Sequence, residues 1–155
     1  MALYRIRPAT LDDIDALVHH RIAMFTEMNS SMDPAAVDAA FRSWLAETVP
    51  SGTYRAWVAE TPEAVVVAGG GFTLLPWPPG PQWLGGRVAF VYNIYTEPTH
   101  RLRGLARSIM DAIHDWCRTH GIGVVALTAS AAARPLYESM GYGEAASPTL
   151  WAALE

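Results

Sequence analysis

The sequence predicts a mixed α/β fold with one central sheet, and three observations indicate this class. Hydrophobic residues make up 51% and charged residues 17% of the 155 residues, which is typical of a folded chain with a substantial core. Short apolar or alternating segments, typical of strands, are interleaved with longer segments of helical spacing. Proline and glycine separate these segments. We therefore expect the order β-α-α-β-β-β-α-β-α-β-β in a single domain covering residues 1–155.

The first half of the chain predicts a strand, two helices and two further strands. Residues 4–7 alternate in polarity and end at Pro8, as a short strand does. Thr10 is placed to cap a helix that reaches about Met28, with two aspartates in its first turn. Pro34 begins a second helix, which the Pro50-Ser51-Gly52 sequence ends. Two antiparallel strands are expected at 54–60 and 65–75, and three glycines at 69–71 interrupt the second one.

The second half begins with a loop at residues 76–86, whose four prolines and three glycines exclude regular structure. The continuously apolar segment 123–128 is expected to be a strand buried on both faces. It should lie parallel to the strand at 87–96, and the carboxyl ends of the two can separate to form a ligand crevice. The elements expected here are strands at 87–96, 123–128, 142–146 and 149–154, helices at 103–119 and 135–140, and a Ser147-Pro148 break between the last two strands.

The turn after the strand at 87–96 has the pattern R-x-x-G-x-A, formed by Arg101, Gly104 and Ala106. Glycine allows a ligand to approach the backbone, and the free N–H groups at a helix start attract anions. Together with Arg103 and Arg107, this turn could neutralise a pyrophosphate. The alternative is a solvated basic helix start with no ligand.

Composition excludes several other classes of function. A formal net charge of −4 argues against a nucleic-acid surface, and the sequence has no apolar run long enough to span a membrane. The single cysteine, Cys117, excludes a disulfide within the chain, and no secretory signal is seen, so a cytoplasmic location is expected. His114 and His120 flank this cysteine as H-x-x-C-x-x-H, but on a helix they do not converge, so no metal is expected.

The R-x-x-G-x-A turn and the later Leu136-Tyr137-Glu138 sequence, followed by Gly141-Tyr142, together resemble the GNAT superfamily of acyl-CoA-dependent N-acetyltransferases. The resemblance covers nearly the whole chain, because the order of elements also matches. It implies a GNAT-like fold, acetyl-CoA as cosubstrate, and central strands that separate at the coenzyme site. The sequence YNIYTEP at residues 92–98 is similar to the version of this strand found in many bacterial members.

The resemblance also implies which residues bind the coenzyme and which perform chemistry. Ser130 occupies a position where many members have asparagine near the coenzyme, and Tyr137 corresponds to the tyrosine near the thioester sulfur, where its phenol could protonate the leaving thiolate. The backbone that would bind the pantetheine arm belongs to Ile94, Tyr95 and Thr96. The residues that would bind the pyrophosphate are Arg101, Leu102, Arg103, Gly104, Leu105, Ala106 and Arg107.

The general base is the feature that this sequence does not match. Where some members have a glutamate on the central strand, this chain has Phe90, so we expect Tyr92 on the same strand face to act through water. The alternative for Tyr92 is ordinary strand packing, and Glu97 and Glu27 are weaker candidates.

The resemblance implies that the first two helices and the loop before the central strand wall the acceptor site. This places Phe25, Met28, Trp77 and Trp83 as acceptor contacts. For the two tryptophans, a hydrophobic clamp over the sheet or a contact in a homodimer is an equal alternative.

Two hypotheses for function follow. The first is an enzyme that moves the acetyl group of acetyl-CoA to a primary amine of a small molecule or peptide by direct attack. The second is an acyl-CoA-binding module with little catalysis, used in sensing or interaction. Tyr137 favours the enzyme, and the missing strand carboxylate favours the module. The acceptor itself is not encoded in any recognisable motif.

Overall fold

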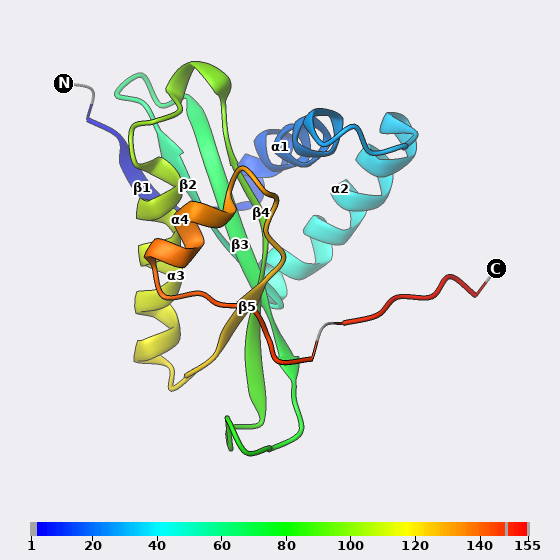
Figure 1. The fold of residues 1–155 in the computed structure, drawn as a ribbon. Helices are drawn as coiled ribbons and strands as arrows, with labels where there is room; N and C mark the ends of the chain where they lie inside the picture. The colour runs from blue at the N-terminus through cyan, green and yellow to red at the C-terminus, as the bar shows by residue number, and fades with distance from the viewer. Residues whose placement is uncertain (1–2, 148, 155) are drawn as a thin grey trace.

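The computed structural model describes residues 3–147 and 149–154 and shows a five-stranded sheet between two layers of helices (Figure 1). Helices α1 and α2 cover one face of the sheet, and α3 and α4 cover the other. None of the described helices combines the length and apolar character needed to cross a membrane. The strands are β1 (Arg5–Pro8), β2 (Tyr54–Glu60), β3 (Val66–Pro76), β4 (Arg87–Thr96) and β5 (Val125–Leu127), and the helices are α1 (Ile14–Glu27), α2 (Pro34–Ser51), α3 (Leu105–Thr119) and α4 (Arg134–Ser139), with 3-10 turns at Leu11–Asp13 and Pro98–His100.

The five strands lie in chain order across the sheet, which confirms the mixed α/β class. Strands β1 to β4 are antiparallel to their neighbours, and β4 and β5 are parallel. Strand β5 pairs only over Val125–Leu127 and is half-buried, so the longer strand expected at 123–128 with both faces buried is wrong. The reason is its position at the edge, where β4 is its only paired neighbour among the described strands.

The two strands expected at 142–146 and 149–154 are also wrong. No described residue in either segment joins the sheet, and Pro148, expected between them, lies outside the described residues. The apolar side chains that suggested the last strand are almost fully exposed, with Leu150 and Trp151 at 89% and Leu154 at 95%. An alternating or apolar pattern forms a strand only when a neighbouring strand pairs with it and a core covers it.

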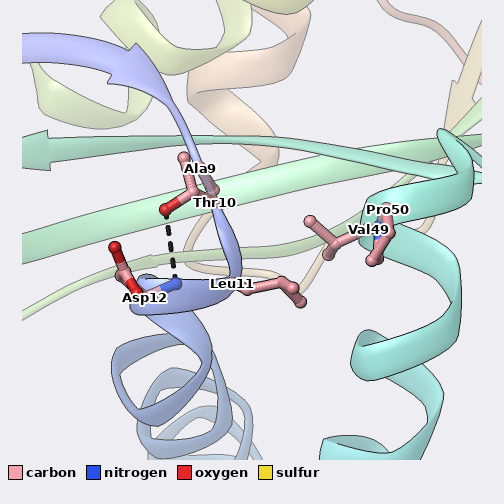
Figure 2. Close-up of a pocket in the computed structure, with 6 residues that line it drawn as sticks. All are labelled: Ala9, Thr10, Leu11, Asp12, Val49 and Pro50. Atoms are coloured by element: carbon pink, nitrogen blue, oxygen red, sulfur yellow. Dashed lines mark hydrogen bonds between the residues drawn. The ribbon is translucent and has the colours of Figure 1, made fainter.

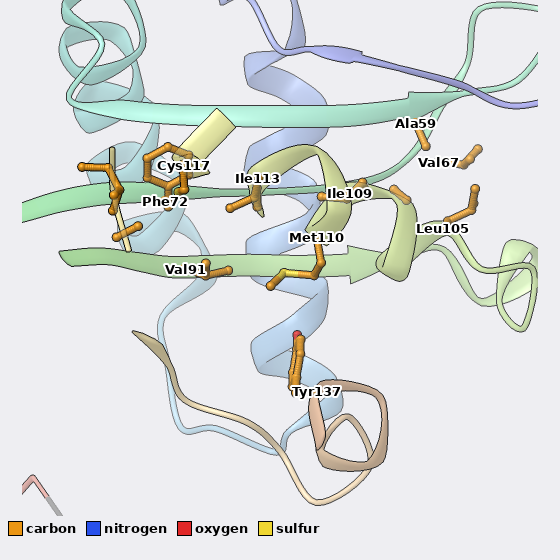
Figure 3. Close-up of a cluster of buried hydrophobic side chains, with 13 residues drawn as sticks. Ala59, Val67, Phe72, Val91, Leu105, Ile109, Met110, Ile113, Cys117 and Tyr137 are labelled. Carbon is orange, nitrogen blue, oxygen red and sulfur yellow. The ribbon is translucent and has the colours of Figure 1, made fainter. Parts of the chain in front are cut away.

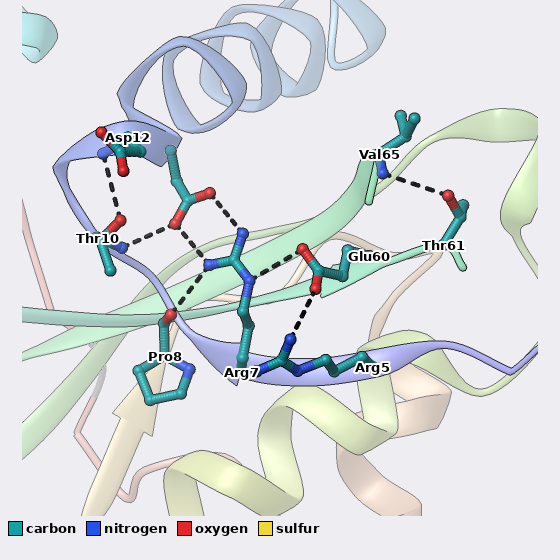
Figure 4. Close-up of polar contacts among 9 residues, drawn as sticks. Arg5, Arg7, Pro8, Thr10, Asp12, Glu60, Thr61 and Val65 are labelled. Atoms are coloured by element: carbon teal, nitrogen blue, oxygen red, sulfur yellow. Dashed lines mark hydrogen bonds and ion pairs between the residues drawn. The ribbon is translucent and has the colours of Figure 1, made fainter. Parts of the chain in front are cut away.

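A cluster of ion pairs joins β1 and β2 to the start of α1 (Figure 4). The guanidinium of Arg7 donates to both carboxylate oxygens of Asp13, at 2.8 and 2.9 Å, and to Oε2 of Glu60 at 3.0 Å. Burial alone would raise the pKa of Asp13, but the hydrogen bonds from Arg7 and Thr10 outweigh it and hold that pKa below its usual value. Thr10 and Asp13 also form a capping box, so the predicted helix start is confirmed.

The larger core lies between the sheet and the apolar face of α3 (Figure 3). Helical spacing places five buried residues of α3 on one face, as its sequence pattern predicts. Cys117 is one of them, and burial raises the pKa of its thiol to about 11, which makes it a packing residue rather than a nucleophile. The five are Leu105, Ile109, Met110, Ile113 and Cys117.

Glycines in β3 allow neighbouring residues to pack directly against its backbone. A Cβ at Gly70 would lie 2.2 Å from Cδ1 of Ile94, and one at Gly71 would lie 2.4 Å from the carbonyl oxygen of Arg55 and 2.6 Å from Cζ of Tyr54. Real Cβ atoms do not approach other atoms this closely. A larger residue at Gly71 would therefore require the backbone of the sheet to move, and one at Gly70 would require the side chain of Ile94 to shift. The glycines that interrupt the predicted strand are therefore a packing requirement.

His20 is buried on the sheet side of α1, with 1% of its surface exposed. Its ring lies against the ring of Tyr95, with centroids 5.2 Å apart, and neither ring nitrogen has a hydrogen-bond partner among the described residues. Gly69 leaves the space that this ring needs, because a Cβ there would lie 3.2 Å from Nδ1. Burial, with a smaller contribution from the neighbouring His19, lowers the pKa of His20 to about 4.

We expect Gly71→Ala to destabilise the fold by about 1–3 kcal/mol, because the new methyl group overlaps the backbone of β2 and the ring of Tyr54. Gly86→Ala is the matched control, since a Cβ at Gly86 meets no atom within 4 Å. Urea denaturation measures both variants. Similar unfolding midpoints for the two would contradict the packing role of Gly71.

We expect the free energy of unfolding to decrease between about pH 6.5 and pH 4 because of His20. The unfolded chain binds a proton on this imidazole near pH 6.5, and the folded chain does so only near pH 4. Stability from the neutral ring is therefore complete above pH 6.5 and is lost on acidification, by up to about 3 kcal/mol. Denaturation curves at pH 7 and pH 5 should show a smaller decrease for His20→Leu, and an equal decrease would show that the ring is not responsible.

Candidate functional site

Strand β4 is paired with β5 near its start and continues beyond the end of β5 without it. The pairing covers Ala89–Val91 opposite Val125–Leu127 and no further. A cavity of about 740 Å³ opens beyond this point, between the two strands and under α1 and α4. A crevice at the carboxyl ends of separated strands is the usual ligand site of α/β sheets, as the sequence suggests.

The cavity brings together most of the residues that the sequence predicts for the coenzyme. From β4 it includes Ile94, Tyr95 and Thr96, whose backbone has no β5 partner. Ser130 lies on the opposite wall, and the turn before α3 closes one end. The turn and helix residues that line it are His100, Arg101, Leu102, Gly104, Leu105, Ala106 and Arg107.

The turn before α3 has the geometry of an anion site. Gly104 is the N-cap of α3 and has φ +77°, and Leu102 has φ +60°, so two residues of the turn have left-handed conformations. No side chain caps the helix, which leaves the N–H groups of its first turn free for a ligand. A Cβ at Gly104 would meet no protein atom within 4 Å, so the space above it is open. These features fit a diphosphate bound by backbone amides.

The arginines of this turn have protein partners, which the sequence does not reveal. Arg101 donates to the carbonyl oxygen of Thr96 at 2.8 Å and forms an ion pair with Glu27 at 2.6 Å. Arg103 donates to the hydroxyl of Tyr4 at 3.2 Å and is not among the residues that line the cavity. Arg107 donates to Ser139 at 2.6 Å. The amides are therefore the better-placed anion ligands.

Tyr137 lines the cavity from α4, a short helix with proline in its first turn. Its hydroxyl forms no hydrogen bond with the described residues, and burial raises its pKa to about 12. A phenol with this pKa is protonated at neutral pH, so its proton is available for donation. Ser130 precedes the helix and accepts a hydrogen bond from the N–H of Ala133 at 3.2 Å, so it also fixes the approach to α4.

A bulge in β4 places Tyr92 and Asn93 on the same face of the sheet. Tyr92 and Tyr95 pair with Gly71 and Gly69, so two residues of β4 oppose the single residue between those glycines. Asn93 has φ +61°, a conformation that asparagine tolerates better than most residues. Both side chains consequently lie on the α1 side, where they line the cavity.

The remaining wall comes from the second half of α1. Phe25 and Met28, predicted to contact the acceptor, line the cavity here together with Met24. Arg21 also lines it, which sequence reasoning missed. The available signal was helical spacing, because Arg21 lies four residues before Phe25 and seven before Met28 on the same helix face.

Trp77 and Trp83 do not line this cavity. They belong to the loop between β3 and β4, at the opposite end of β4 from the turn before α3 (Figure 1). Trp83 donates from Nε1 to the carbonyl oxygen of Arg87 at 3.0 Å, and its ring occupies the space that a Cβ at Gly85 or Gly123 would need. The contacts of Trp83 correspond to a clamp over the end of the sheet, whereas Trp77 is 53% exposed.

A second hollow of about 410 Å³ lies between the start of α1 and the end of α2 (Figure 2). It is lined by Ala9, Thr10, Leu11, Asp12, Val49 and Pro50. The side chain of Thr10 is already occupied as the helix cap, accepting from the N–H of Asp12 at 3.3 Å. Among the described residues, no group of three histidine, cysteine, aspartate or glutamate side chains could hold a metal ion here or elsewhere.

The sequence and the fold correspond to a known family. The chain matches the Acetyltransferase (GNAT) family over residues 15–142 and belongs to it. The general activity of this family is acetyl-CoA-dependent N-acetylation, so the chain is an acetyltransferase with acetyl-CoA as its cosubstrate. A comparison with curated proteins finds no match.

Solved structures agree with this assignment over almost the full chain. A GCN5-related N-acetyltransferase from Ralstonia eutropha JMP134 is 30% identical, with a TM-score of 0.87 over 97% of this chain and 99% of that one. A predicted acetyltransferase from Clostridium acetobutylicum, solved with acetyl-CoA, is 24% identical, with a TM-score of 0.85 over 99% and 96% of the two chains. A ribosomal-protein-alanine N-acetyltransferase from Brucella melitensis biovar Abortus 2308 is 18% identical, with a TM-score of 0.74 over 99% and 100%. The last two likenesses show the fold alone.

We expect Gly104→Val to raise the dissociation constant for coenzyme A at least tenfold, because a branched side chain would occupy the space above the amides. Gly121→Val is the matched control. Gly121 has a similar φ of +71° and open space around it, but it lies beyond the other end of α3. Calorimetry should find near-native affinity for the control, and native affinity for Gly104→Val would exclude the proposed phosphate turn.

Proposed function

We propose that residues 1–155 form one acetyltransferase domain that moves an acetyl group to a primary amine of a small molecule or a peptide by direct attack. The continuous cavity carries this proposal. It runs from the amides before α3, along the free backbone of Ile94–Thr96, past Tyr137, to the wall formed by α1. A cavity of this kind can hold the coenzyme and an amine side by side, which supplies much of the rate in a direct transfer.

In this proposal, Tyr137 is the general acid. The amine nitrogen forms a bond to the thioester carbonyl carbon, the carbon–sulfur bond breaks, and the leaving thiolate takes the phenolic proton of Tyr137. The free hydroxyl of Tyr137 supports this role, and its pKa of about 12 keeps the phenol protonated until the thiolate forms. The backbone N–H groups of β4 beyond Val91 are the available donors for the carbonyl oxygen.

The proton lost by the amine requires a different acceptor. Phe90 stands where a carboxylate would be useful, and the one carboxylate among the lining residues, Glu27, is paired with Arg101. We propose that a water at the hydroxyl of Tyr92 takes this proton to solvent. The hydroxyl of Thr73, on the neighbouring strand, donates to the hydroxyl of Tyr92 at 3.5 Å. The phenolic proton of Tyr92 is therefore directed away from Thr73.

Release of thiol from acetyl-CoA in the presence of a panel of primary amines tests the proposal. Turnover with at least one amine is expected. Binding of acetyl-CoA with no turnover on any amine would instead indicate the acyl-CoA-binding module, which the lack of a strand carboxylate favours.

We expect Tyr137→Phe to lower kcat at least tenfold and to change the affinity for acetyl-CoA less than twofold, because the variant lacks only the proton donor. Tyr142→Phe is the matched control. It removes the hydroxyl of a neighbouring tyrosine that bonds to His114 at 2.6 Å and is not among the lining residues. Equal kcat for the two variants would remove the acid role from Tyr137.

A further inference from the structure

Arg21 lies on α1, lines the cavity and contacts the rings of two phenylalanines. Its guanidinium carbon lies 4.9 Å from the ring centre of Phe25 and 4.8 Å from that of Phe41. It donates a hydrogen bond from NH1 to Oδ1 of Asn93. Burial lowers its pKa, against smaller opposing effects of Tyr54 and Tyr92. The guanidinium is thus fixed in position by neutral groups.

Arg21 has no carboxylate partner among the described residues, which distinguishes it from Arg101 at the same cavity. Arg107, the third arginine of the lining, donates to Ser139. Arg101 is paired with Glu27, whereas the groups around Arg21 are an amide, two phenols and two phenyl rings. Placing a cation in such surroundings costs free energy that a carboxylate would recover. This uncompensated guanidinium lies where the side chain of Arg21 lines the cavity.

The position of Arg21 corresponds to the acceptor end of the cavity. Strand β4 runs from Asn93 through Ile94 and Thr96 to the anion turn, so the coenzyme would extend from the turn back towards Asn93. Arg21 and Asn93 therefore lie beyond the thioester, beside the acceptor-wall residues Phe25 and Met28.

We propose that the acceptor is a small amine that carries a carboxylate, and that Arg21 binds this carboxylate while Asn93 orients the guanidinium. This inference rests on the proposed function, since it specifies the acceptor of that reaction. A single guanidinium matches one negative charge, and a bidentate carboxylate uses the planar donors that remain after the bond to Asn93. The bound ion pair would place the amine of the same molecule near the thioester.

Binding and turnover are measured separately. The probes are the twenty common α-amino acids, β-alanine and 4-aminobutyrate, each compared with its carboxamide. Calorimetry on the protein saturated with coenzyme A gives the affinity of each probe, and thiol release from acetyl-CoA gives turnover. We expect at least one amino acid to bind ten or more times more tightly than its carboxamide.

Arg21→Gln should abolish this difference while leaving the affinity of the carboxamide within about twofold. Arg42→Gln is the matched control, because Arg42 links α1 to α2 through Asp15 and Asp38 and lies outside the cavity lining. Asn93→Asp is a second variant, which tests the same inference if Arg21→Gln does not fold. It supplies Arg21 with an internal carboxylate at nearly the same volume, so it should also abolish the preference.

Equal affinity for amino acids and carboxamides, a preference that persists in Arg21→Gln, or no binding of any carboxylated probe would each overturn the inference. The proposed function fails by a different result, namely acetyl-CoA binding with no thiol release on any amine. Carboxylate-dependent binding without thiol release would therefore support the role of Arg21 and contradict the proposed function. Thiol release that is equal for carboxylated and neutral amines would support the proposed function and contradict the role of Arg21.

Discussion

The close contact between β3 and β4 at the Asn93 bulge is the constraint on which the site depends. The extra residue of β4 turns the strand so that Tyr92 and Asn93 both face α1, and it comes where the pairing with β5 has ended. Gly70, opposite the bulge, leaves space for the side chain of Ile94, whose Cδ1 would lie 2.2 Å from a Cβ at this position. A regular strand would direct Asn93 towards α3 and would leave Arg21 without its hydrogen-bond partner.

Charge at the site is arranged differently at its two ends. At the end that we propose for the coenzyme, Arg101 and Arg107 line the cavity but are bonded to Glu27, Thr96 and Ser139, and the backbone amides before α3 are free. At the end that we propose for the acceptor, Arg21 is bonded to the amide of Asn93 and to no carboxylate among the described residues. In a chain with a net charge of −4, both ends depend on local groups rather than on a general attraction of anions.

The sequence predicts local features of this structure better than those that depend on distant contacts. Caps, helical spacing and proline breaks locate the helices, and Thr10 forms the capping box that its neighbours suggest. The motif around Gly104 locates the start of α3, which no side chain caps. The terminal strands fail because pairing needs a partner that an alternating pattern does not specify. Arg101 pairs with a residue 74 positions away, which spacing within a motif cannot reveal.

Helix α1 has two halves that differ in how they are attached. Its start is joined to the sheet by the Arg7–Asp13 pair, whose side chains are 23% and 5% exposed, and Leu17, Val18 and His20 are buried nearby. Its end is attached by Arg101–Glu27, with side chains 41% and 45% exposed, where solvent weakens the pair. The evolutionary consequence is a separation of tasks within one helix. If the proposed acceptor site is correct, residues of the last two turns can change the acceptor specificity, while the first two turns preserve the fold.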